Sequence, residues 1–186
     1  FDSPDGEFVE KGGAAQVMRA KSLLSTYSAT ASGPRKLFTY CPAIAGITSA
    51  LCPAASAGVL TAAANAFSTG NASITNTALG VDLLARNTLI NWFAGQDNKT
   101  GDELGPGGTV TVRPSVHGDV IHSRPVVVNY GDTRGTVVYY GANDGVYRAV
   151  NGSQTQALGT TPPGGELWGL VAPEHFKKIN RLREND

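Results

Sequence analysis

Two histidines and an aspartate lie close together and are the first candidates for chemistry in this sequence. His117, Asp119 and His122 are residue types that bind metal ions or exchange protons. On an extended strand, His117 and Asp119 would share one face, while His122 would point to the other. Three ligands cannot converge from one flat strand in that arrangement. We therefore expect structural roles, in which the Asp119 carboxylate accepts turn amides and His122 donates to a neighbouring carbonyl.

The two cysteines of the chain, Cys41 and Cys52, are close in sequence and each precedes a proline. This pattern favours a disulfide in an oxidising compartment over two free, buried thiols. A cross-link that closes so short a loop would contribute about 2–3 kcal/mol. The spacing is not that of a redox-active C-x-x-C pair, and no nearby His or Cys completes a zinc site.

An acidic loop invites a calcium hypothesis. Asp97, Asp102 and Glu103 lie among Asn and Thr residues, with Lys99 between them. The acids do not alternate as in an EF-hand loop, and no glutamate occupies its last position. We expect a solvated loop without a metal. The sequence also contains no Gly-x-Ser-x-Gly elbow and no phosphate-binding loop, so we predict that the chain is not an enzyme.

The candidate residues at 117–122 are followed by short apolar runs that must position them. These runs are Val126–Val128, Val137–Tyr140 and Val146–Val150. Each is rich in β-branched residues and closes in turn residues such as Asn143-Asp144-Gly145, which predicts strands joined by tight turns. Gly145 should take a positive φ, and Asn143 or Asp144 should accept backbone N–H groups. We expect an antiparallel meander with residues 166–168 as its outer strand, which is one blade of a propeller.

Within the third run, Val146, Arg148 and Val150 should share one face of the strand. Tyr147 and Ala149 should share the other.

Residues 81–94 give the strongest helical pattern, with an apolar stripe that begins at Leu83 and Leu84 and should pack on the flank of the blade. Residues 14–21 are compatible with a helix or with a strand, and we favour a hairpin with residues 36–40. Residues 53–80 are rich in small polar residues and are interpreted as a surface insertion. The charged stretch 177–186 is interpreted as a surface helix or linker.

The predicted fold class is therefore mainly β with some helix: a partial β-propeller with a loop and helix insertion. Residues 1–112 would hold opening strands, the disulfide-bearing insertion and the helix. Residues 113–186 would hold the blade and a trailing helix or linker. We interpret the chain as a fragment of a longer precursor.

Composition excludes several classes of partner. The 186 residues carry 15 basic and 15 acidic side chains, and 16% of residues are charged. This gives neither the electrostatic footprint of a nucleic-acid-binding protein nor a polybasic membrane patch. No apolar run is long enough for a transmembrane segment, and no signal peptide is recognisable.

Three short sequence motifs, in this order along the chain, resemble motifs of one known family. Residues 118–128 read GDVIHSRPVVV, residues 140–145 read YGANDG and residues 165–168 read GELW. Together they resemble the blade signature of the PilC/PilY family of type IV pilus tip proteins. The residues that carry this structural blade motif are Asp119, His122, Ser123, Pro125, Asn143, Asp144, Gly145 and Trp168.

The resemblance implies a non-enzymatic protein of the periplasm and cell surface that lies at the pilus tip. Such proteins support pilus assembly, control retraction and mediate adhesion. The implied partners are pilin-like subunits and a host or abiotic surface. The loops 22–34, 41–80 and 151–165 would be available for these contacts. The family is known for a calcium loop of the D-x-D-x-D-G type. That motif is not found here, so calcium is expected only elsewhere in a longer chain.

Two other functions remain open. Ala142, Asp144, Gly165 and Trp168 have the spacing of the tryptophan-docking motif of quinoprotein dehydrogenases, which suggests a related blade architecture. Those enzymes also have vicinal cysteines, whereas Cys41 and Cys52 are not adjacent in this sequence. The third alternative is a structural propeller module of an unrelated secreted protein.

Overall fold

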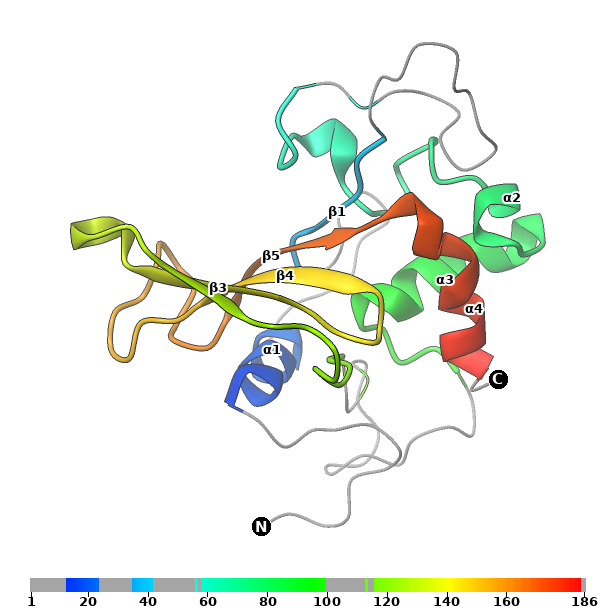
Figure 1. Ribbon diagram of the computed structural model, residues 1–186. Coiled ribbons are helices and arrows are strands. Elements are labelled where there is room, and N and C mark those ends of the chain that lie inside the picture. The colour runs from blue at the N-terminus through cyan, green and yellow to red at the C-terminus, as the bar shows by residue number, and fades with distance from the viewer. Residues whose placement is uncertain are drawn as a thin grey trace, which may run out of the picture.

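The computed structural model describes residues 13–23, 35–41, 56, 58–99, 113 and 116–184. In this part of the chain, one five-stranded sheet is combined with several helices, which makes the architecture mixed α/β (Figure 1). The sheet is open, and no propeller forms within the described residues. Helices contribute more than the predicted mainly β class implied.

The predicted antiparallel meander is confirmed. Its strands are β2 (Val126–Asn129), β3 (Thr136–Gly141), β4 (Val146–Asn151) and β5 (Glu166–Val171). Consecutive strands pair with one another in antiparallel register. All four contain the β-branched and aromatic residues that fit a pleated surface.

Residues 166–168 lie in β5, the outer strand of the meander, as predicted, but β5 is not the edge of the whole sheet. A fifth strand, β1 (Leu37–Phe38), pairs in parallel with β5 and gives the order β1-β5-β4-β3-β2. The other side of β1 is also paired, because Thr39 N donates to Asn65 O and Phe67 N donates to Leu37 O. The open edge of the sheet within the described residues is therefore β2.

The predicted hairpin between residues 14–21 and 36–40 was wrong. Gly13–Leu23 form the helix α1, as their helix-forming residues allow. α1 lies against one face of the sheet, where Met18 packs with Val150 and Tyr140 (Figure 1). Residues 37–38 join β5 instead of returning to this segment.

The main core lies at one end of the sheet, where three helices gather (Figure 1). These are α2 (Asn76–Leu79), α3 (Leu83–Ala94) and α4 (Phe176–Glu184). Their apolar residues pack with Val146 and Val171 of the sheet. The core residues from the helical segments are Phe67, Ile74, Ala78, Leu79, Leu89, Ile90, Trp92, Phe93, Ala94, Phe176 and Ile179.

This core corrects two expectations and decides between the alternatives of a third. The helix predicted at 81–94 is present and buries the C-terminal part of its expected stripe, but Leu83 and Leu84 are exposed because the first turns of α3 lie outside the core. Residues 53–80 were expected to be a surface insertion, yet the described part of this stretch supplies Phe67, Ile74 and Leu79 to the core. Residues 177–186 were expected to form a surface helix or a linker; a helix, α4, forms over Phe176–Glu184 and is anchored in the core by buried Phe176 and Ile179.

Candidate functional site

The turn between β3 and β4 is the most tightly organised feature outside the cores. Gly145 has a φ of 82°, as its glycine predicted, and its N–H donates to Ala142 O at 3.1 Å. One oxygen of the Asp144 carboxylate accepts from Val146 N at 3.0 Å. The side chain of Asp144 therefore closes its own turn, as the sequence predicted for this position.

The segment before β2 lies directly on this turn. Gly118 N donates to the other Asp144 oxygen at 2.9 Å, and Asn143 N donates to Asp119 O at 2.9 Å. A Cβ at Gly118 would lie 2.7 Å from Asp144 N, so this position has no room for a side chain. Nearby, Gly141 N donates to Ser123 Oγ at 2.9 Å. Two of the motifs that carry the resemblance, residues 118–128 and 140–145, are therefore joined by hydrogen bonds.

A buried ionic network extends from the turn into the sheet. Arg148, which is fully buried, donates through its guanidinium to Asp144 and lies 3.2 Å from Glu166 through Nε. Glu166 in turn accepts two hydrogen bonds from Arg35, at 3.0 and 2.9 Å. Two cations and two carboxylates therefore alternate in a row, and their formal charges cancel.

The pKa values follow from this pairing. Burial alone would raise the pKa of Asp144, but the charge and hydrogen bonds of Arg148 lower it to about 2. Burial would likewise raise the pKa of Glu166, and Arg35 and Arg148 together lower it below its ordinary value. Both carboxylates therefore stay ionised at neutral pH, so neither is poised to donate or accept a proton there.

His117 lies beside the network in a structural role. One ring nitrogen lies 2.7 Å from the Tyr140 hydroxyl, and the other lies 2.6 Å from Gly118 O. Burial lowers the pKa of His117, and the charge of Arg148 lowers it further. This keeps the imidazole neutral at pH 7, which is compatible with a ring that links two hydrogen-bonding groups.

The contacts of the other residues in the predicted blade motif differ from those that we expected. Within the described chain, neither the Asp119 carboxylate nor the exposed His122 ring has a hydrogen-bond partner, and Asp119 contributes its backbone carbonyl instead. Pro125 is exposed immediately before β2, and Trp168 is half-buried in β5. Among the described residues, no group of three or more His, Cys, Asp or Glu side chains is placed to hold a metal ion.

Sequence reasoning missed the network partners Arg35, Arg148 and Glu166. One signal for Arg148 was present, because the alternation of β4 places this charge on the same face as Val146 and Val150. A charge among buried apolar neighbours requires an opposite charge nearby. The identity of that partner depends on strand pairing and was not readable.

Aromatic residues gather on the sheet face opposite α1. Tyr139, Tyr147 and Trp168 have ring centroids 6.1–6.4 Å apart. Tyr147 is 44% exposed, and the segment at η1 (Ala63–Asn65) borders part of this cluster, because Thr61 and Ala63 line a pocket together with Tyr139 and Trp168. The Tyr139 hydroxyl is hydrogen-bonded to that of Tyr130, which together with burial raises the pKa of Tyr139 to about 12. We call Tyr139, Tyr147 and Trp168 the aromatic face.

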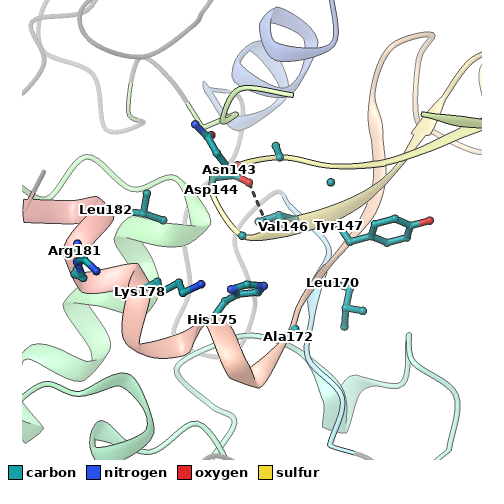
Figure 2. A pocket seen from close by; sticks show the side chains of 13 residues that line it. Asn143, Asp144, Val146, Tyr147, Leu170, Ala172, His175, Lys178, Arg181 and Leu182 are labelled. Atoms are coloured by element: carbon teal, nitrogen blue, oxygen red, sulfur yellow. Dashed lines mark hydrogen bonds between the residues drawn. The ribbon is translucent and has the colours of Figure 1, made fainter. Parts of the chain in front are cut away.

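A pocket of about 490 Å³ lies between the Asn143–Gly145 turn and α4 (Figure 2). Figure 2 shows Lys178 and His175 directed into the space below the turn, with Arg181 further along α4. Leu170, Ala172 and Leu182 supply its apolar lining. Asp144 also borders the pocket, but its carboxylate is already bound to Arg148 and to two amides.

Three further predictions concern the disulfide, the acidic loop and membrane-spanning segments, and each involves residues outside the described part of the chain. Cys41 is buried and disulfide-bonded. Cys52 lies outside the described residues, so the Cys41–Cys52 pairing stays a prediction. Most of the acidic loop, from residue 100 onward, lies outside them too. Within the described ranges, no helix combines the length and the apolar character needed to cross a bilayer.

No family model matches the chain, and the searches of curated proteins and of solved structures returned no match.

Proposed function

We propose that this chain is a segment of a PilC/PilY-like type IV pilus tip protein, with a non-enzymatic role in pilus assembly, control of retraction and surface adhesion. In this proposal the four-stranded meander is one blade of a β-propeller completed by other parts of the protein. The protein lies in the periplasm and at the cell surface. Its partners are pilin-like subunits and the host or abiotic surface.

One observation carries the proposal. The residues that form the resemblance act on one another: Gly118 and Asp119 bind the Asn143–Asp144 turn, and Ser123 caps Gly141 N. Sequence motifs that contact each other in the fold form one structural unit. Such contacts support a shared blade architecture more strongly than the presence of separate motifs does.

The aromatic face supports the same interpretation. Tyr147 is 44% exposed and Val126, at the edge of the sheet, is 56% exposed. A contiguous apolar surface of this kind is characteristic of an interaction site. In a propeller, such a face is covered by the neighbouring blade.

The non-enzymatic role rests on the ionic network. The carboxylates of Asp144 and Glu166 are held by Arg148 and Arg35, with lowered pKa values. Acids held in this way stabilise a fold, whereas a general acid or base needs a pKa near the working pH.

The proposal is tested in the source organism. Pili are sheared from the cells and probed for this chain with an antibody, in the wild type and in two variants of the parent protein. Arg148→Met breaks the buried network, and Arg134→Met changes an exposed arginine that makes no ion pair within the described residues. Protein levels are measured in each strain.

We expect the chain in the pilus fraction, with fewer pili and weaker attachment for Arg148→Met and normal values for Arg134→Met. A soluble periplasmic chain in cells that keep normal pili after deletion of the segment would contradict the proposal. A redox cofactor bound to the purified parent would favour the quinoprotein alternative.

A further inference from the structure

The pocket between the Asn143–Gly145 turn and α4 has the size of a ligand site. Its volume of about 490 Å³ lies within the range of roughly 300–1,000 Å³ of pockets that hold small ligands or a few residues of a peptide. One wall is the turn, which the buried network fixes in place. The opposite wall is η3 (Pro173–His175) and α4, which are anchored in the core by Phe176 and Ile179 (Figure 2). Both walls are therefore preorganised.

The charge of this pocket is positive. Lys178 and Arg181 are one turn apart on α4 and border the pocket together with His175. Lys178 and Arg181 make no ion pair with any carboxylate in the described part of the chain. The one carboxylate at the border is that of Asp144, and its negative charge is neutralised by Arg148. Two cations at a preformed pocket without an internal counter-charge favour an anionic ligand.

The shape and the remaining lining narrow the class of ligand. Leu182 places an apolar side chain next to the two cations, and Leu170 and Ala172 line the other side of the pocket (Figure 2). A ligand that fits both parts carries a carboxylate beside an apolar group. Nucleic acid is disfavoured, because the chain has 15 basic and 15 acidic residues and therefore no excess of positive charge to bind a phosphate backbone.

We propose that this pocket binds a short acidic peptide segment of a partner protein. The carboxylate of the segment is held by Lys178 and Arg181, and a neighbouring apolar side chain packs on Leu182. This inference goes beyond the proposed function and does not depend on it, since it rests on the pocket and its charges alone.

The test uses the intact chain and a fluorescein-labelled hexapeptide with two glutamates flanking a leucine, measured by fluorescence anisotropy at physiological salt. A matched peptide has glutamines in place of the glutamates. Unlabelled glutarate serves as a competitor that offers carboxylates without a peptide. The variants are Lys178→Gln and Arg181→Gln. The control is Lys177→Gln, which removes the same charge from an exposed neighbour that packs beside Gly80 and does not line the pocket.

We expect saturable binding of the glutamate peptide and at least about tenfold weaker binding of the glutamine peptide. Lys178→Gln and Arg181→Gln should each weaken binding by about tenfold, and Lys177→Gln by less than about twofold. Equal binding of the two peptides, or equal losses for Lys177→Gln and Lys178→Gln, would overturn the proposal. Competition by glutarate at the same concentration as unlabelled peptide would overturn the assignment to a peptide. Failure of any of these expectations leaves the pilus-fraction experiment unaffected, so the two proposals can be judged separately.

Discussion

At the scale of single residues, the stability of this protein depends on the buried side chain of Arg148. Its guanidinium has no exposed surface and holds Asp144 on one side and Glu166 on the other. A buried ion pair stabilises a fold little more than apolar side chains of similar volume would, because the free energy needed to remove both charges from water is about as large as the attraction between them. Removing one partner is different, because the other charge stays buried without compensation.

Arg148→Met should therefore lower the free energy of unfolding by about 3–5 kcal/mol. Methionine fills part of the space of the arginine stem but leaves the Asp144 carboxylate without its cation. Urea unfolding at neutral pH measures the change. Arg134→Met is the matched control and should change the free energy of unfolding by less than about 0.5 kcal/mol, because Arg134 is exposed. Similar values for the two variants would contradict the role assigned to Arg148.

The network also predicts a pH dependence. The pKa of Asp144 is lowered in the folded protein to about 2, whereas an unfolded aspartate has a pKa of about 3.9. A lowered folded pKa gives stability that is complete above the unfolded pKa and is lost as the pH falls through the folded pKa. Glu166, whose pKa is also lowered, acts in the same direction.

The free energy of unfolding should thus fall between about pH 5 and pH 2, with about 2 kcal/mol of the loss due to Asp144. Asp144→Asn removes this titration, so its stability should depend less steeply on pH. Urea unfolding at several pH values measures both slopes. Parallel curves for the variant and the wild type would show that Asp144 does not titrate as the network requires.

At the scale of elements, the packing of residues 116–123 on the β3–β4 turn determines how this segment is attached to the sheet. The contact at Gly118 is too close for any side chain, since a Cβ would meet Asn143 Oδ1 at 2.3 Å and Asp144 N at 2.7 Å. Backbone cannot move away as easily as the end of a flexible side chain can. The segment and the turn must therefore separate if this glycine is replaced.

Gly118→Ala should destabilise the protein by about 1–3 kcal/mol or more, as overpacking does. Gly13→Ala provides the comparison, because a Cβ at the start of α1 meets nothing within 4 Å. It should be neutral or slightly stabilising. The two variants are compared by thermal unfolding. A Gly118→Ala melting temperature equal to that of the wild type would show that the segment is not docked on the turn.

The elements that could be predicted from sequence are those that local patterns specify. The β-branched runs with turn residues after them predicted β2 to β5 and their antiparallel order, and Gly145 predicted its own positive φ. β1 was not predictable as a partner of β5, because two residues carry no periodicity and the partner strand lies far along the chain. The helix α1 was missed because its composition was compatible with either structure, and packing on Val150 decides between them.

The candidate site also contains residues that could be predicted from sequence and residues that could not. The turn residues Asn143, Asp144 and Gly145 were identified from their own chemistry. The ionic partners Arg35 and Glu166 come from separate strands or loops, and only the assembled sheet brings them to Arg148. The exposure of Leu83 and Leu84 could not be read from the helical pattern, because only the assembled core shows that the second half of α3 is covered and its first turns are not.

At the scale of the whole molecule, the two faces of the sheet differ. One face is covered by α1 and by the helical core, and the other presents the aromatic face. In the propeller that we propose, blades from other parts of the pilus-tip protein would lie against the aromatic face and the open β2 edge, because a propeller blade has neighbours on both sides.

The exposure of Trp168 tests this account most directly, because the chain contains its own control in Trp92. Trp92 is 3% exposed in the helical core, and Trp168 is half-buried on the aromatic face. Both tryptophans are oxidised with a mild reagent in the isolated chain and in the full parent protein, and the products are quantified by mass spectrometry. We expect Trp92 to be protected in both proteins, and Trp168 to react in the isolated chain but to be protected in the parent. Equal reactivity of Trp168 in the two proteins would show that no neighbouring blade covers this face.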